Sequence, residues 1–167
     1  MVERSQYCMG REAYRERLLH RLEEDEARLV FAETLPYGRI YLSNRVGLRK
    51  RPFTIPHPKR RSAFLINIGV AAFPDTLSNS SLLIHELTHV WQGTHRRTPF
   101  SYLLDSVFNQ VLRGDQCYEY ELGKRWSQYS AEQQAMLVQD WFEDGMSTLP
   151  SDERFPYIRD HIRTGTV

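Results

Sequence analysis

Two histidines and a glutamate stand close together in the middle of the chain. The five-residue run that begins at His85 and ends at His89 is an H-E-x-x-H motif. On an α-helix, residues four apart lie one turn above each other on the same face, so the two imidazoles can bind a single Zn²⁺. Glu86 points about 100° away around the helix axis, where it can reach a water molecule bound to the metal. The spacing therefore predicts a zinc site with Glu86 as general base.

The residues around the motif predict a buried helix of about 13 residues. A Ser/Asn run over 78–81 offers N-caps and Gly93 offers a stop. The buried face would consist of Leu83, Leu87, Val90 and Trp91. Burying unpaired polar groups costs several kcal/mol, and a zinc ion would give these histidines and the glutamate a partner. The alternative is a core helix whose histidines are satisfied by hydrogen bonds alone.

A catalytic zinc usually has three protein ligands, so one more ligand is needed. The extended pattern H-E-x-x-H-x-x-G-x-x-H fails, because Gln92 stands at its glycine position and Gly93 falls one residue late, so His95 cannot be assumed to face the metal. A carboxylate from a later element is favoured, and the candidates are Glu119, Glu121, Glu132 and Asp140. We favour Glu132, in the first turn of the last predicted helix, where Ala135 would let two helices approach closely. The helix dipole alone also favours an acidic residue there, so Glu119, Glu121 and His95 remain alternatives.

The hydrolytic reaction also needs a donor for the oxyanion that forms when hydroxide attacks a peptide carbonyl. We predict that Tyr118 and Tyr120, which lie between the two ligand-bearing segments, are catalytic residues of this kind. Tyr129 and His95 are further candidates. Aromatic residues in such a stretch also commonly belong to the core.

The elements that would position these residues belong to an α+β fold. We expect an amphipathic helix over 10–30, whose apolar face would consist of Tyr14, Leu18, Leu22 and Leu29. One or two short strands are expected in 39–48, and the best strand over 62–70. An exposed edge of that strand would pair with an extended peptide. The basic, proline-rich segment 49–61 favours a loop or edge segment. Further helices are expected over 100–112, from Ser130 onward, and near 157–162. Ser130 and Gln133 predict a capping box at the start of the second of these helices.

Composition is that of one soluble globular domain. The chain has 167 residues, of which 41% are hydrophobic and 26% charged, with a net charge of +1. This balance argues against nucleic-acid binding, no apolar run predicts a membrane span, and the polar N-terminus predicts no secretory signal. Cys8 and Cys117 match no metal pattern, and we expect two free thiols rather than a bridge. Within the single domain, residues 1–61 form an N-terminal segment, residues 62–145 a catalytic core and residues 146–167 a tail.

Three stretches together carry a family resemblance. They are HELTHVWQ from His85, YEY from Tyr118, and YSAEQQA over 129–135. They resemble the zincin metallopeptidase domains, of the gluzincin type, that are fused to VgrG-type spike and Rhs-type proteins of type VI secretion systems. The resemblance covers about residues 62–145. It implies a zincin-like fold, with a small sheet, an edge strand beside the motif helix and a helical C-terminal half.

The same resemblance implies His85, His89 and Glu132 as zinc ligands and Glu86 as the catalytic base. It also implies delivery into a rival or host cell, a cognate immunity protein and a secretion-spike component as partner. We therefore expect a zinc metallopeptidase that acts on a protein or peptide. It would be secreted without a signal peptide and delivered into a target cell, to its periplasm for example, or would otherwise be cytoplasmic. The alternatives are a peptidoglycan amide hydrolase and a non-catalytic zinc-binding interaction domain.

Overall fold

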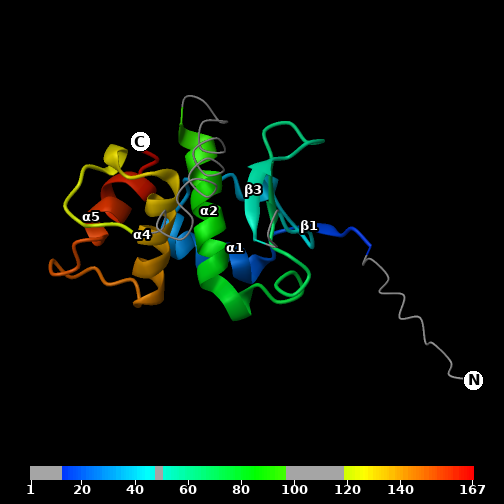
Figure 1. Cartoon of the computed structure of the whole chain (residues 1–167), viewed down its shortest axis with the longest axis horizontal. Helices are drawn as coiled ribbons and strands as arrows, with labels where there is room; N and C mark the ends of the chain where they lie inside the picture. Colours follow the sequence, from blue (N-terminus) through cyan, green and yellow to red (C-terminus); the bar gives the residue numbers. More distant parts are fainter. Residues whose placement is uncertain (1–12, 48–50, 97–118) are drawn as a thin grey trace, which may run out of the picture.

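A long central helix separates a small sheet from the C-terminal helices. The computed structural model describes residues 13–47, 51–96 and 119–167. Figure 1 shows helix α2 (Ser80–His95) between the sheet on one side and helix α4 (Ala131–Glu143) on the other. Helix α1 (Arg21–Phe31) also contacts α2. The α+β class and the small sheet predicted from the sequence are confirmed.

The sheet has four strands in the order β1-β2-β4-β3. These are β1 (Glu16–Leu18), β2 (Ile40–Ser43), β3 (Phe53–Pro56) and β4 (Phe64–Asn67). Strands β2 and β4 are parallel, and each outer strand runs antiparallel to its neighbour. Every residue of β4 is buried, as expected for an apolar strand covered on both faces.

An edge strand does lie beside the motif helix, but the sequence placed it in the wrong segment. The strand predicted over 62–70 forms as β4, which lies inside the sheet between β2 and β3. The edge strand that contacts α2 is β3, from the basic, proline-rich segment. Pro56 ends this strand and cannot donate to a ladder, so an edge position suits it. The alternative of an edge segment within 49–61 was therefore correct.

The predicted helix over 10–30 is wrong for residues 13–20, where β1 forms instead. Helix α1 begins only at Arg21, because the buried Glu23 carboxylate accepts a hydrogen bond of 2.7 Å from the backbone N–H of His20. Arg17 pairs with the same carboxylate at 2.7 Å, and the Thr76 hydroxyl donates to it. This local cluster ends the strand and starts the helix.

The apolar face predicted for that helix is also wrong. Its members are exposed, and Leu22 retains 65% of its accessible surface. Helix α1 instead buries Glu23, Ala27, Val30 and Phe31. The charged Glu23 occupies a core position because Arg17 neutralises it, and a hydrophobic pattern cannot anticipate such a substitution.

The two helices of the candidate site form much as the sequence predicts. The four apolar residues predicted to be buried on the motif helix are buried: Leu83, Leu87, Val90 and Trp91. Helix α2 nevertheless runs 16 residues and continues past Gly93, which does not stop it. The predicted capping box of α4 is present, with the backbone N–H of Gln133 donating to Ser130 Oγ at 3.2 Å.

The C-terminal segment closes the core on the far side of α2. It contains α5 (Phe155–Tyr157) and the π-helical turn η6 (Ile158–Ile162), where a short helix was predicted. The indole N–H of Trp91 donates to the carbonyl of Ile162 at 3.0 Å and ties this turn to the motif helix. The predicted helix over 100–112 and both cysteines lie outside the described residues.

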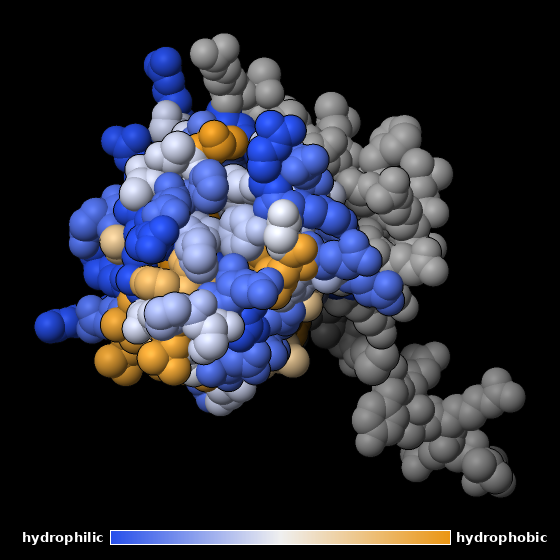
Figure 2. Space-filling model, turned by 90° about the vertical axis from the view of Figure 1, so that its left-hand side faces the viewer, coloured by the Kyte–Doolittle hydropathy of each residue, from blue (hydrophilic) through white to orange (hydrophobic). Residues whose placement is uncertain are grey.

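The surface gives little sign of a broad apolar face on the side toward α4 and α5. Figure 2 shows this side as mostly hydrophilic, with small groups of apolar side chains between polar ones. Within the three described ranges, no helix is both long enough and apolar enough to cross a membrane.

Close approach of α2 and α4 depends on a small residue. Ala135 is fully buried and lies one turn after Glu132 on the same face of α4. We predict that Ala135→Leu lowers the free energy of unfolding by about 1–3 kcal/mol, because the larger side chain must push the helices apart. Urea denaturation measures this change. Met136→Leu on the half-exposed face is the control, and an equal loss in both variants would contradict a tight interface.

Candidate metal centre

Two elements bring the ligand atoms of His85, His89 and Glu132 together. One atom from each residue lies within 4.8 Å of the other two, and all three side chains are buried. Glu132 Oε2 lies 3.3 Å from His85 Nε2 and 3.6 Å from His89 Nε2. The histidines stand one turn apart on α2, with ring centroids 5.1 Å apart. Glu132 comes from the first turn of α4.

These distances suit a tetrahedral metal ion. Two ligands bound to zinc at about 2.0–2.1 Å in a tetrahedron lie roughly 3.3 Å from each other. The two nitrogen-to-carboxylate distances of 3.3 and 3.6 Å are close to that value. Two imidazoles and one carboxylate are also a common protein ligand set for a zinc ion that keeps one position open. The His-His-Glu group can therefore hold a metal ion.

The outer nitrogen of each histidine is held by a glutamine. His85 Nδ1 lies 3.0 Å from Gln139 Oε1 on α4, and His89 Nδ1 lies 2.9 Å from Gln92 Oε1 on α2. An amide oxygen accepts a hydrogen bond, so each contact favours the tautomer that carries its hydrogen on Nδ1. Each Nε2 is then available as a metal ligand, and its ring orientation is fixed.

Gln92 is itself held in place by a buried hydrogen-bond network. Its side-chain nitrogen donates to the Ala131 carbonyl at 2.9 Å and to Gln134 Oε1 at 3.0 Å. The Gln134 amide donates in turn to the Trp126 carbonyl at 2.9 Å. The network links the end of the motif helix to the start of α4, where Glu132 lies, so it sets the distance between the ligands on the two helices.

Without a metal, the site holds opposite charges in contact. Burial would lower the pKa of His89, but the carboxylate of Glu132 raises it to about 9. Burial would raise the pKa of Glu132, but the charge of His89 and hydrogen bonds from both histidines hold it well below its usual range. At neutral pH the pair is therefore ionic, and a metal ion must displace the proton from His89.

Glu86 lies beside this group and is also buried. Its side chain is held from the sheet, because Thr54 on β3 donates its hydroxyl to Glu86 Oε2 at 2.7 Å. In the part of the chain that the structure describes, Glu86 belongs to no group of metal-binding side chains. The neighbouring position on α2 thus places a carboxylate next to the metal centre but outside the ligand set.

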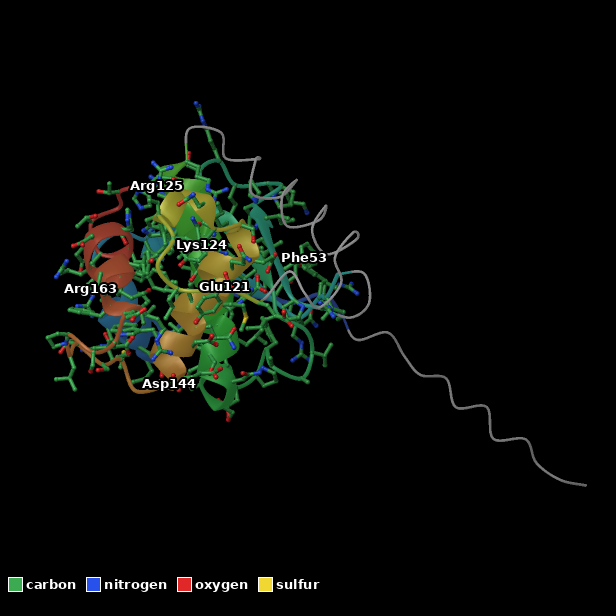
Figure 3. The ribbon with its side chains drawn as sticks, turned by 60° about the vertical axis from the view of Figure 1, so that its left-hand side comes forward. Phe53, Glu121, Lys124, Arg125, Asp144 and Arg163 are labelled. Atoms are coloured by element: carbon green, nitrogen blue, oxygen red, sulfur yellow. The ribbon has the colours of Figure 1, made fainter. Side chains whose placement is uncertain are left out.

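The other ligand candidates lie elsewhere. His95 Nε2 lies 2.8 Å from the Thr34 carbonyl, and its ring packs against Trp91. Glu121 is strongly exposed and pairs with Lys124 at 3.6 Å, and Figure 3 shows both on the segment that leads into α4. Glu119 is exposed. Among the described residues, none of these joins the His-His-Glu group.

The hydroxyls of the described oxyanion-donor candidates, Tyr120 and Tyr129, bond to residues outside the His-His-Glu group. The Tyr120 hydroxyl donates to Asp140 at 2.8 Å, and burial together with this bond raises the pKa of Tyr120. Tyr129 donates to the Glu121 carbonyl at 2.9 Å. Tyr118 lies outside the described residues. The role of Tyr118 and Tyr120 in the reaction stays a prediction.

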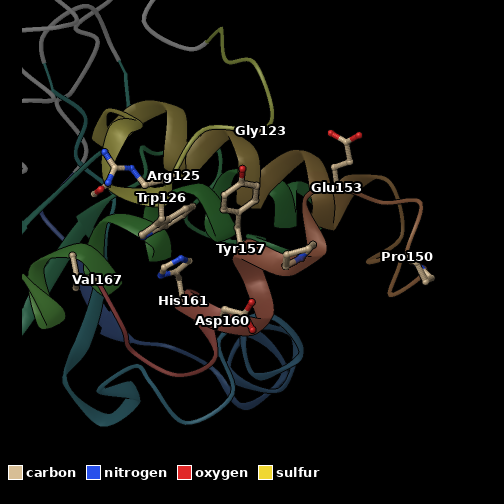
Figure 4. Close-up of a pocket in the computed structure, with 11 residues that line it drawn as sticks. Gly123, Arg125, Trp126, Pro150, Glu153, Tyr157, Asp160, His161 and Val167 are labelled. Carbon is tan, nitrogen blue, oxygen red and sulfur yellow. The ribbon is translucent and has the colours of Figure 1, made fainter.

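A separate hollow of about 680 Å³ lies between the segment before α4 and the C-terminal turn. The rings of Trp126 and His161 stack there with centroids 5.4 Å apart (Figure 4). Its polar groups have local partners, since Asp160 pairs with Arg159 at 2.6 Å and His161 Nδ1 lies 2.9 Å from the Thr166 carbonyl. None of the residues of the His-His-Glu group lines the hollow. The His-His-Glu group is therefore the better candidate for the functional site.

The sequence analysis did not identify the residues that hydrogen-bond to the two histidines and to Glu86. Gln92 stands three residues after His89 on the same helix, and Gln139 stands seven residues after Glu132 on the same face of α4. Helical spacing could have found both. Thr54 carried no signal, because its contact with Glu86 joins a strand and a helix 32 residues apart in the chain.

The bond from Gln139 to His85 makes a testable prediction about metal affinity. We expect Gln139→Ala to weaken zinc binding by about 10-fold or more, because His85 loses the group that fixes its tautomer. Gln139→Glu keeps an acceptor and should stay near the wild-type affinity. Competition with a fluorescent chelator measures both. Equal affinity for the alanine variant and the wild type would show that Gln139 does not orient the ligand.

Comparison with known proteins adds one partial relative. Over 104 residues, the chain is 35% identical to the type VI secretion system spike protein VgrG2b of Pseudomonas aeruginosa. The match covers 58% of this chain and 10% of the spike protein, so the chain spans about a tenth of that relative. No protein-family model and no solved structure matches the chain.

Proposed function

We propose that this chain is a zinc-dependent metallopeptidase domain of zincin type that cleaves peptide bonds in a target cell. The observation that carries the proposal is the convergence of His85, His89 and Glu132, with Glu86 buried beside them. A zinc ion held by these three ligands would activate a water molecule and polarise a carbonyl oxygen. Without such a reaction, the burial of these four polar side chains would have no evident chemical purpose.

Glu86 supplies the acid–base chemistry in this proposal. Its carboxylate accepts the proton of the attacking water and later returns that proton to the leaving amine nitrogen. His85 and His89 hold their ring planes through Gln139 and Gln92 and do not exchange protons with substrate. Glu132 would offset part of the positive charge that a divalent cation brings into the core, since the two imidazoles are neutral when they bind metal.

A peptide substrate has a place to bind at the edge of the sheet. Strand β3 contacts α2, and within the described ranges it pairs with β4 alone. An extended peptide that pairs with the outer edge of β3 would gain backbone hydrogen bonds and lie alongside the helix that carries Glu86. Such binding recognises main-chain N–H and C=O groups, so it favours unfolded or extended protein segments as substrates.

The proposed route of delivery into a target cell is based on the similarity to VgrG2b. VgrG2b is a type VI secretion spike protein, and similarity to it fits delivery of this chain by such a system. In this proposal the domain reaches a rival or host cell with a spike component, and the producing cell protects itself with an immunity protein. Co-purification of the chain with a spike component is the measurement that addresses the delivery step.

Exchanging Glu86 for Gln separates metal binding from catalysis. We predict that Glu86→Gln keeps its zinc and loses turnover by about 100-fold or more, because glutamine has the same shape but cannot take up a proton. The assay uses fluorescein-labelled, denatured casein, and mass spectrometry measures the zinc content of each sample.

Three other outcomes would count against the proposal. Full activity in Glu86→Gln would refute the assigned base. Cleavage of muropeptides by the wild type, without cleavage of casein, would favour a peptidoglycan amide hydrolase. Bound zinc in the wild type without hydrolysis of either substrate would favour a non-catalytic metal-binding domain.

A further inference from the structure

One side chain links the edge strand directly to the proposed general base. Thr54 lies on β3, where it pairs with Ile66 of β4. It is only 4% exposed. Its hydroxyl oxygen lies 2.7 Å from Glu86 Oε2 and 3.2 Å from the Glu86 backbone carbonyl. The sheet and the motif helix thus meet at the residue to which catalysis is assigned.

The shorter of these two contacts determines where the hydroxyl proton points. A hydroxyl has one hydrogen to donate, and a carboxylate is a stronger acceptor than a backbone carbonyl. The backbone carbonyl of Glu86 belongs to α2, where the helix itself offers it a donor. The Thr54 hydroxyl therefore serves mainly the Glu86 side chain, which is buried and needs a donor.

Anchoring one oxygen of Glu86 leaves the other for chemistry. In residues 13–47, 51–96 and 119–167, no hydrogen bond to Glu86 Oε1 is recorded, whereas Oε2 is held by Thr54. A glutamate side chain has three rotatable bonds, and small displacements of a catalytic group cost large factors in rate. A donor on a rigid strand fixes the carboxylate in one orientation beside the metal ligands.

We infer that Thr54 is a positioning residue that holds Glu86 in register with the edge of β3. The inference rests on the proposed function of Glu86 as general base. Because Thr54 belongs to the strand whose outer edge would bind the peptide, the same strand fixes both the substrate and the base. The distance between the scissile bond and Glu86 is then set by β3 rather than by the rotamer of a long side chain.

Three variants of Thr54 test this role. Thr54→Val keeps the shape and loses the hydroxyl, and Thr54→Ser and Thr54→Ala differ from each other only in the hydroxyl. We expect kcat on labelled, denatured casein to fall about 10-fold or more in the Val and Ala variants, with KM and zinc content unchanged, and to recover in the Ser variant. If Thr54→Val fails to fold, the Ser and Ala pair alone decides.

A matched control removes a buried hydroxyl whose hydrogen bond, among the described residues, goes to a backbone carbonyl. Thr88 on α2 donates to the Ile84 carbonyl at 3.0 Å and is fully buried. Thr88→Val should keep kcat near the wild-type value. In a Glu86→Gln background, Thr54→Val should cause no further loss, because the group that it positions is already inactive. An equal fall of kcat in the Ser and Ala variants, or an added loss in the double variant, would overturn the inference.

A second readout does not depend on activity. In zinc-loaded protein labelled with ¹³C at glutamate carboxyl carbons, the Glu86 resonance is identified by its absence in Glu86→Gln. This resonance should shift or broaden in Thr54→Val and stay in place in Thr54→Ser and Thr88→Val. An unchanged resonance in Thr54→Val would overturn the inference even in an active enzyme. An inactive wild type would count against the proposed function alone, because the resonance still reports the contact.

Discussion

Burial of charge between α2 and α4 is the constraint on which the rest of the structure depends. Two imidazoles and a carboxylate are buried between these helices, and charges are tolerated in such a place only when they are paired. Glu132 supplies the opposite charge for His89 in the absence of metal. The ligand atoms of all three side chains lie close enough together to bind one cation. The two helices must therefore stay at a fixed distance.

The surrounding elements meet that requirement by hydrogen bonding rather than by apolar contact alone. Gln92 and Gln134 connect α2 to the start of α4, and Gln139 connects the middle of α4 back to His85. Strand β3 holds Glu86 from the opposite side. A bound metal would add its own binding free energy to folding, since the unfolded chain has no formed site.

The sequence predicted the features of the site that depend on local spacing. The motif helix, its buried apolar face and the capping box that starts α4 follow from rules within a few residues. Selection of Glu132 drew on helix position and on a family resemblance, and the structure brings it to the histidines. The role of the site in catalysis stays a proposal, because geometry alone does not establish a reaction.

Features that depend on contacts between distant segments were not predicted. Strand β1 forms within a segment predicted to be helical because it pairs with β2, and because Glu23 joins Arg17 in the core. The edge strand comes from a proline-rich segment because β4 is needed in the centre of the sheet. Thr54 gains its partner only when sheet and helix assemble. Such contacts leave no periodic signal in the chain.

The most direct test is the zinc content of protein purified without added metal, measured by mass spectrometry. Wild type and Glu132→Ala are compared, with Glu121→Ala as the control because Glu121 is exposed and paired with Lys124. A three-ligand site predicts about one zinc ion per chain in the wild type and the control, and a large loss in Glu132→Ala. Equal zinc in all three would remove Glu132 from the ligand set. No zinc in the wild type, even after zinc is added back, would contradict the account.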